Sequence, residues 1–273
     1  MRKWILLAGM LIWSIAAAAQ SEQTPHWNWK KLGKGVEYSA VQTQLFGRTA
    51  YITAVRYKMY RHRTRIIHAE RREADSTSAL GRQFAAVAAV NGSYFNVKTL
   101  EPTTYLRLGG KRIADTSPKE LFRVDGIFAV DEEGKVAIFP CDTAAYDTAC
   151  EGYEDAIAAG PVLLQGGKPA KDSWPNTGFF SKHHPRTLMG IDNKYRVYMV
   201  VIDGRFPRQG DGASIDETVQ IAQMLGLTDA INLDGGGSCA LWTPSTGVLS
   251  HPYDNHRFDH YGQRIVPNIL YIQ

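Results

Sequence analysis

From Val36 to the C-terminus, short apolar runs alternate with Gly, Asp, Asn and Pro, which restricts the chain to folds rich in β-strands. Runs of this kind, separated by turn-forming residues, are typical of strands joined by tight turns. The segment 132–135 (EEGK) is typical of one such turn, because glycine adopts a positive φ at little cost. Strands are therefore expected at residues 49–57, 84–90, 126–130, 136–139, 156–164, 196–202, 230–233 and 266–272.

One helix is clearly marked. Ser214 and Glu217 have the spacing of a capping box, in which each side chain accepts a hydrogen bond from the other residue's backbone N–H. Apolar residues then recur at helical spacing, and Gly226 supplies a stop signal. The sequence predicts an α+β fold: a single domain of mixed β-sheets packed with few helices, over residues 36–273. A polar lead-in segment, residues 20–35, precedes it.

Composition excludes several classes of protein. Hydrophobic residues make up 44% of the chain and charged residues 21%, close to the globular averages of roughly 45–50% and about 25%. Disordered, coiled-coil and polytopic membrane proteins are therefore poor interpretations. The chain is also long enough to bury a sizeable core without a disulfide framework.

The first 19 residues have the layout of a secretory signal. Arg2 and Lys3 form a basic start, residues 4–15 are almost wholly apolar, and Ala16–Ala19 offers a small-residue cleavage site. A membrane anchor is the alternative, but the apolar stretch is shorter than the ~20 residues of a spanning helix. We expect a secreted or periplasmic protein with no membrane span after signal removal. Loss of Arg2 and Lys3 lowers the net charge from +4 to +2, too little to indicate a nucleic-acid partner.

The three cysteines indicate no metal site. Cys141 and Cys150 flank a polar loop, where they form either a small disulfide or two free thiols in an exported chain. Cys239 follows the triglycine segment, where it is either a reactive thiol or a buried apolar residue. No CxxC or CxxC…HxxxH spacing exists, so a structural zinc site is not predicted.

Three apolar runs end in a polar residue followed by glycine: Asn91-Gly92, Asp203-Gly204, and Asp234 before Gly235, Gly236, Gly237 and Ser238. A carboxylate at a strand end is fixed by the sheet yet reachable by a ligand, and an adjacent glycine allows close approach to the backbone. Each pair alone is equally typical of a hairpin turn. The triglycine segment is harder to explain as a turn, because it costs backbone entropy without adding packing, and we expect it to contact a ligand.

Known nucleotide and nucleophile motifs do not fit the triglycine segment. No Gly-Lys-Ser/Thr follows it, and no GxGxxG opens a helix, so neither a P-loop nor a dinucleotide site is predicted. The segment 236–240 (GGSCA) is only loosely similar to a nucleophile elbow, and the residues after it give little sign of the required helix.

Arginines stand near two of these segments. Arg186 precedes an apolar run, and Arg205 follows Asp203. A guanidinium can donate two hydrogen bonds to one phosphate, although a surface ion pair explains either residue as well.

A cluster near the C-terminus could in principle bind a metal. Its spacing indicates a solvated loop instead, so no metal site is predicted; the cluster is His251, Asp254, His256, Asp259 and His260. No cofactor is expected, although strand-end oxygens could hold a structural calcium ion.

Together these motifs resemble the phosphodiester glycosidase family. The similar segments are 159–164, 184–187 with Gly190, 201–205, 232–238, and Arg264 with 266–268, with Glu217 and 91–95 as further elements. They occur in family order and cover roughly residues 85–272. Cys239 stands where relatives more often carry Ser or Thr, residues 206–214 differ from the commoner form, and Ile265 replaces a frequent Pro. These differences lie near the expected ligand loops and bear on substrate identity more than on reaction type.

The resemblance implies an exported hydrolase that cleaves the bond between an anomeric carbon and a phosphodiester oxygen in a glycan or sugar-phosphate substrate. Asp203, Asp234 and Glu217 are the candidate catalytic carboxylates for an oxocarbenium-like transition state, and the capping box explains Glu217 equally well. Arg186 or Arg205 would hold the phosphate. The candidates for contacts to sugar hydroxyls or phosphate oxygens are Asn91, Asn232, Gly235, Gly236, Gly237 and Ser238. The alternatives are a non-catalytic glycan-binding module and a metal-dependent phosphodiesterase.

Overall fold

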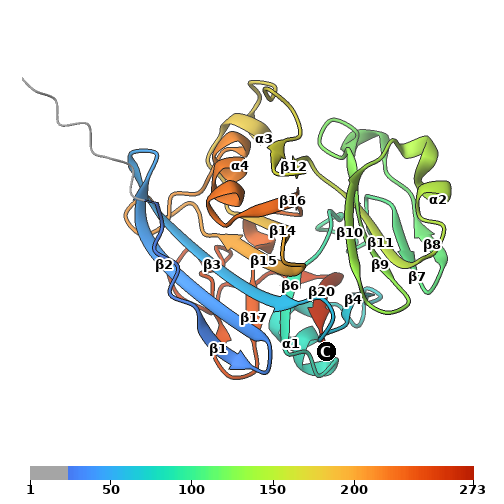
Figure 1. Ribbon diagram of the computed structural model, residues 1–273, viewed down its shortest axis with the longest axis horizontal. Helices are drawn as coiled ribbons and strands as arrows, with labels where there is room; N and C mark the ends of the chain where they lie inside the picture. The colour runs from blue at the N-terminus through green and yellow to red at the C-terminus, as the bar shows by residue number, and fades with distance from the viewer. Residues whose placement is uncertain (1–23) are drawn as a thin grey trace, which may run out of the picture.

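The computed structural model describes residues 24–273, which are built largely from antiparallel β-sheets (Figure 1). The largest sheet has eight strands in the order β1-β2-β3-β15-β14-β16-β12-β13. Its strands are β1 (Lys30–Gly33), β2 (Val36–Leu45), β3 (Arg48–Lys58), β12 (Val162–Gln165), β13 (Lys168–Pro169), β14 (Arg186–Asp192), β15 (Arg196–Ile202) and β16 (Leu227–Asn232).

Two five-stranded sheets and a strand pair complete the β-structure. One sheet, in the order β18-β17-β6-β20-β4, contains β4 (Thr64–His68), β6 (Ala88–Asn91), β17 (Leu241–Thr243), β18 (Gly247–Val248) and β20 (Asn268–Ile272). The other, in the order β10-β9-β11-β7-β8, contains β7 (Leu106–Leu108), β8 (Lys111–Ala114), β9 (Gly126–Asp131), β10 (Val136–Pro140) and β11 (Tyr153–Ala159). The pair is β5 (Asp75–Ser76) with β19 (Ile265–Val266).

Four short helices accompany the sheets within the described residues: α1 (Thr77–Gln83), α2 (Tyr146–Ala149), α3 (Gly178–Ser181) and α4 (Ile215–Met224). The predicted fold class, a single α+β domain of sheets with few helices, is confirmed. None of the helices between residues 24 and 273 is both long enough and apolar enough to cross a membrane. The predicted signal at residues 1–19 lies outside the described residues.

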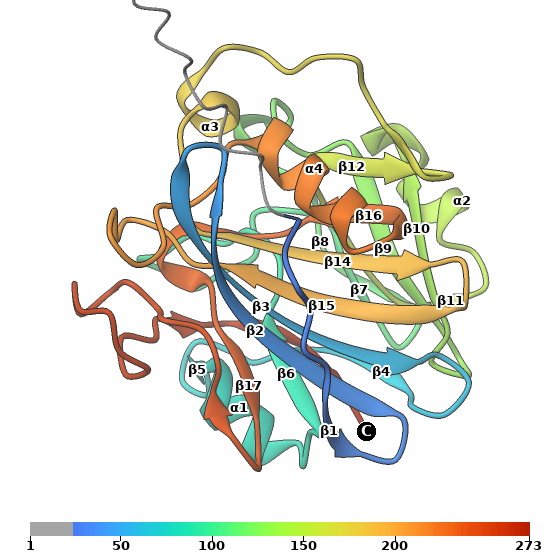
Figure 2. The same cartoon turned by 60° about the vertical axis from the view of Figure 1, so that its left-hand side comes forward.

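The central strands of the eight-stranded sheet are buried on both faces, as β15 shows. Val197, Met199 and Val201 face one apolar cluster, while Tyr198 and Val200 face another. Side chains alternate between the faces of a strand, so a strand that is apolar throughout requires cover on both sides. On one face lies α4; on the other lie the two five-stranded sheets (Figure 2).

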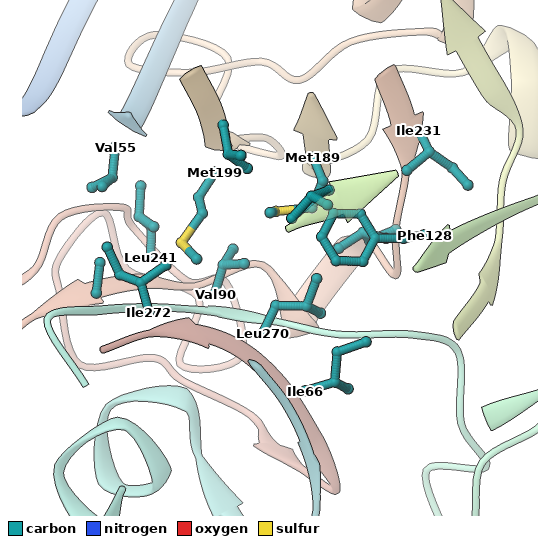
Figure 3. Packing of buried hydrophobic residues seen from close by; sticks show 14 of the residues in the cluster. Val55, Ile66, Val90, Phe128, Met189, Met199, Ile231, Leu241, Leu270 and Ile272 are labelled. Atoms are coloured by element: carbon teal, nitrogen blue, oxygen red, sulfur yellow. The ribbon is translucent and has the colours of Figure 1, made fainter. Parts of the chain in front are cut away.

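The central core fills the space between the sheets (Figure 3). Met189 and Met199 of the large sheet meet Val90 and Leu270 of the β6–β20 sheet and Phe128 of β9. This close packing fixes the positions of the strands relative to one another, and therefore also the positions of their ends.

The helix prediction is confirmed in detail. Ser214 Oγ accepts a hydrogen bond from Glu217 N at 3.2 Å, and Glu217 Oε2 accepts one from Ser214 N at 2.9 Å. The chain leaves the helix through Gly226, whose φ is +75°.

Three strand predictions were wrong in their bounds. The run 266–272 is two strands in different sheets, β19 and β20, divided at Pro267. The run 84–90 becomes a strand only at Ala88, because Ser76 caps α1 by accepting from Ala79 N at 3.3 Å and Phe84 ends that helix. The run 156–164 is two strands in different sheets, because the chain passes from β11 to β12 at Gly160-Pro161 and proline has no N–H to donate to a ladder.

The lead-in segment is partly structured. Residues 30–33 form β1, which pairs with β2 at the edge of the large sheet. Trp27 and Trp29 pack against the apolar cluster that α4 covers.

Candidate active site

Three strand ends meet at one edge of the large sheet. β14 lies between β15 and β16 and is antiparallel to both, so β15 and β16 run in the same direction. Asp203 and Asp234 follow their carboxyl ends, where β14 begins. Asn91, at the end of β6, joins them: its Nδ2 donates to the backbone oxygen of Asp234 at 2.7 Å. The structure thus brings together the three polar-glycine segments.

Glycines are required in the triglycine segment because neighbouring groups occupy the space that side chains would need. A Cβ on Gly235 would lie 2.7 Å from the carbonyl oxygen of Pro185. Gly236 has a φ of +63°, and its Cβ would lie 3.3 Å from Arg205 Nη2. Larger residues would therefore push the segment away from Pro185 and Arg205.

Gly237 faces an ion pair. Its Cβ would lie 2.0 Å from Asp254 Oδ1 and 2.2 Å from Arg264 Nη2. Arg264 holds Asp254 with two hydrogen bonds, Nε to Oδ2 at 2.7 Å and Nη2 to Oδ1 at 2.9 Å. The glycine therefore lets a charged pair from the C-terminal loop approach the backbone after Asp234.

Asp234 has a strongly perturbed carboxyl group. The residue is partly exposed, but protein surrounds its carboxylate on most sides, and this burial raises its pKa to about 6. Ser238 and the positive charges of Arg123 and Arg264 oppose that rise. A carboxyl group with such a perturbed pKa, near positive charges and still ionised at neutral pH, is a candidate for a catalytic role.

The raised pKa of Asp234 predicts a pH-dependent stability. A carboxyl group whose folded-state pKa is about 6, against 3.8 ordinarily, favours the folded state at low pH. This contribution is complete below about pH 3.8 and is lost as the pH rises through 6. The Asp234→Asn protein should therefore melt above the wild type at pH 8, and the two Tm values should converge near pH 4. Thermal unfolding of both proteins between pH 4 and pH 8 measures this difference in Tm. A wild type that melts above Asp234→Asn at pH 8 would contradict the prediction.

Two further arginines flank Asp234. Arg205 is exposed, has a φ of 68°, and stacks over the ring of Tyr253 at 5.0 Å. None of the ion pairs found between residues 24 and 273 involves Arg205. Arg123 lies 3.8 Å over the ring of Tyr94 and pairs with Glu120, its Nε at 2.6 Å from Oε2. Arg205 therefore keeps its charge available to an anionic ligand.

Asp203 lies at the expected edge but is almost fully buried, with 2% exposure. Both of its carboxylate oxygens accept from the backbone N of His251 at 3.1 Å, and Oδ2 lies 2.7 Å from His251 Nδ1. Burial raises the pKa of Asp203, and the contacts with His251 oppose that rise. The carboxylate is therefore directed at one histidine.

Arg186 is also buried, with 2% exposure. Its Nε donates to the carbonyl of Ala213 at 2.9 Å, and its Nη2 donates to those of Phe179 and Lys182 at 2.7 and 3.3 Å. Burial lowers its pKa to about 10. These contacts tie the start of β14 to α3 and to the segment before α4, so the side chain has a structural role beside any contact with substrate.

Glu217 is occupied by structural contacts as well. Beyond the capping box, both of its carboxylate oxygens accept from Arg48 Nη2 at 2.8 Å. Its side chain is 14% exposed. These contacts give the Glu217 carboxylate a structural role at the start of α4, and its charge also acts on Arg186 at the start of β14.

The remaining predicted residues differ in whether their side-chain polar atoms already have hydrogen-bond partners. Asn91 Oδ1 accepts from Thr187 Oγ1 at 2.8 Å and from Ala240 N at 3.2 Å, which fixes the strand ends to one another. Asn232 donates to the Tyr94 hydroxyl at 3.0 Å. Asn232 Oδ1 and Ser238 Oγ are buried without a hydrogen-bond partner among residues 24–273. The Ser238 hydroxyl lies close enough to the Asp234 carboxylate to lower its pKa.

Sequence reasoning missed Arg123 and the role of His251. Arg123 carries no motif and comes from the loop before β9. His251 stood in the C-terminal cluster considered as a metal site, but its ring contacts Asp203. Among residues 24–273, no three His, Cys, Asp or Glu side chains gather in a group that could hold a metal ion. All three cysteines are free thiols.

Comparison with known proteins identifies the family and similar folds. A model of the phosphodiester glycosidase family matches residues 84–273. The fold is similar to the catalytic domain of zebrafish N-acetylglucosamine-1-phosphodiester alpha-N-acetylglucosaminidase, auto-inhibited by its pro-peptide, with a TM-score of 0.70 and 17% identity over 88% of this chain and 84% of that chain.

Two bacterial structures are also similar. A hypothetical protein from Synechocystis has a TM-score of 0.65 and 15% identity, over 91% of this chain and 64% of that chain. A Burkholderia pseudomallei protein, named as an exported protein, has a TM-score of 0.61 and 14% identity, over 84% of this chain and 75% of that chain. Among curated proteins, none matches significantly. The resemblance seen in the sequence is confirmed, and because the family model covers well over half of the chain, this protein belongs to the phosphodiester glycosidase family.

Proposed function

We propose that the protein hydrolyses glycosyl phosphodiesters at the bond between the anomeric carbon and the phosphate oxygen. One observation carries this proposal: the Asp234 carboxylate adjoins the triglycine segment, against which the exposed Arg205 guanidinium lies. Arg123 and Arg264 both act on the pKa of Asp234, and Arg205 lies against the adjacent Gly236. Cations attract an anionic diester, while a carboxylate stabilises positive charge on a sugar ring.

The division of labour follows from the charges. A phosphodiester leaves as a stable phosphate anion, so it needs less protonation than the alcohol of an ordinary glycoside. Arg205 is the guanidinium best placed to hold that phosphate, because it is exposed and near the glycine backbone. Asp234 then faces the anomeric carbon, where positive charge develops in the transition state, as nucleophile or as electrostatic partner. The Ser238 hydroxyl, which lowers the pKa of Asp234, can donate to either the carboxylate or the phosphate.

The bond that breaks tests this function. The protein would be incubated in ¹⁸O-labelled water with a panel of sugar 1-phosphodiesters. We expect a free reducing sugar that carries the label and an unlabelled phosphate monoester. Label in the phosphate, with release of sugar 1-phosphate, would indicate attack at phosphorus and a phosphodiesterase. Tight glycan binding without any product would indicate a binding module.

Replacement of Arg205 by Ala should raise KM more than it lowers kcat. A lost charge-assisted hydrogen bond to phosphate corresponds to roughly 10–100-fold in affinity. Arg208→Ala, an exposed arginine of the same loop, is the matched control and should leave both constants unchanged. Steady-state kinetics on one diester measures the effect; equal KM values for the two variants would contradict the assignment of Arg205.

Export of the protein is part of the proposal. The layout of residues 1–19 supports it. N-terminal sequencing of the mature protein from the periplasm or medium should begin at Gln20, and an uncut chain in the cytoplasm would oppose export.

A further inference from the structure

We propose that His251, oriented by Asp203, takes the proton of the attacking water, and that Asp203 is a positioning residue rather than a carboxylate that touches the sugar. This inference rests on the proposed hydrolase function and goes beyond it, because it assigns the two strand-end aspartates different roles.

The contacts of Asp203 leave it little other function. An ionised carboxylate only accepts hydrogen bonds, and its oxygens are directed at the backbone N and ring Nδ1 of His251. The 2.7 Å contact with Nδ1 favours the tautomer in which that nitrogen carries the proton. Nε2 then has a free lone pair, which is what a general base requires.

Three rings fix the orientation of the His251 imidazole. Phe258 stacks on it with centroids 3.6 Å apart and planes 10° apart, and Tyr51 meets it edge-on at 4.6 Å. His260 lies 4.4 Å away, its own Nδ1 held 2.8 Å from the carbonyl of Ser250. Tyr51, whose pKa is raised by burial, stays neutral. Asp203 is therefore the anion that faces His251, and it stabilises the imidazolium formed when a proton arrives.

The fold brings His251 to the sheet edge at which Asp234 lies, because His251 is bonded to Asp203 at the end of the parallel strand β15. Asp203 and Asp234 end strands that are two ladder spacings apart, roughly 10 Å. His251 belongs to the same loop as Asp254, which with Arg264 packs against Gly237. A substrate held at the triglycine segment thus has Asp234 from the sheet and His251 from the loop within one site.

In the proposed step one bond forms and one bond breaks at the anomeric carbon. The water oxygen bonds to the anomeric carbon while the bond to the leaving oxygen breaks, and the bonding electrons go to that oxygen. The leaving oxygen belongs to the phosphate in a one-step reaction, and to Asp234 if a glycosyl-enzyme forms first. The water proton passes to His251 Nε2, and solvent later removes it.

Kinetics of His251→Gln tests the assignment. We expect kcat to fall ~10²–10⁴-fold, the usual contribution of general acid–base catalysis, with little change in KM. Added imidazole should restore part of the activity of His251→Ala. His256→Asn, an exposed histidine of the same loop whose φ of 58° asparagine tolerates, is the control and should retain wild-type kcat. Active wild type alongside a fully active His251→Gln protein would overturn the inference while leaving the proposed function intact.

A second measurement reads the tautomer of His251 directly in the wild type. In ¹⁵N-labelled wild type at neutral pH, we expect His251 to be protonated at Nδ1 and unprotonated at Nε2, with a downfield Nδ1 proton. Asp203→Asn should abolish that proton signal and alter the pH profile of kcat, which a merely structural role would not do. The opposite tautomer in the wild type would overturn the inference. Absence of hydrolysis on every diester would instead contradict the proposed function.

Discussion

Asp234→Asn is expected to lower kcat by ~10³–10⁴-fold, because an amide cannot stabilise positive charge at the anomeric carbon or act as a nucleophile there. The substitution keeps the size of the side chain, so the contacts around the triglycine segment should persist. In the wild type, kcat/KM should rise as the pH passes through the Asp234 pKa of about 6, because the ionised form is required.

The loss at Asp234 should be separable from unfolding. Asp172→Asn, at an exposed aspartate of the loop before α3, is the matched control and should retain wild-type kinetics. Since Asp234→Asn is also expected to melt above the wild type at pH 8, low activity combined with high Tm is the diagnostic result. An Asp234→Asn protein with most of the wild-type kcat would sink the assignment of this carboxylate.

Arg186→Met is expected to be the most destabilising single substitution among the predicted site residues. It leaves the carbonyls of Phe179 and Lys182 without their donor and removes one of the two donors to that of Ala213, which keeps His184 N. Hydrogen bonds to charged groups contribute ~1.5–3 kcal/mol each, so a loss of about 3 kcal/mol in the free energy of unfolding is a conservative expectation. For a chain of this length that corresponds to roughly 6–12 °C in Tm.

Two comparisons make the Arg186 result specific. Arg186→Lys keeps the charge but not the fork, so it should fall between wild type and Arg186→Met. Arg205→Ala should change KM with little effect on Tm, since Arg205 is exposed. An unchanged Tm in Arg186→Met, together with a large rise in KM, would show that Arg186 binds phosphate instead of supporting β14.

Much of the fold could be predicted because its signals are local. Ser214, Glu217 and Gly226 define α4 through contacts within a few residues, and the strand 196–202 was predicted with its observed bounds. The long runs 84–90 and 156–164 were wrong in their bounds, because their breaks depend on which sheet each half joins. That choice is made by distant strands, which no local pattern shows.

For the site, too, local signals marked the residues, whereas distant partners set their roles. Polar-glycine strand ends marked Asn91, Asp203 and Asp234, but their different roles arise from partners far along the chain. His251 is 48 residues from Asp203, and Arg48 is 169 residues from Glu217. Burial of Arg186 and proximity of Arg123 to Asp234 are likewise properties of tertiary packing. A sequence can name such residues without showing which of them face a substrate.

The position of β20 has a consequence for how this molecule assembles. β20, residues 268–272, lies between β6 and β4 (Figure 1). Both of those strands come from residues 64–91, so most of the chain separates them from β20 in sequence. The ladder that holds Asn91, and through it the backbone of Asp234, therefore depends on a pairing of high sequence separation, and pairings of that kind form slowly. Recovery of enzymatic turnover during refolding should consequently lag behind formation of the hairpin between β2 and β3.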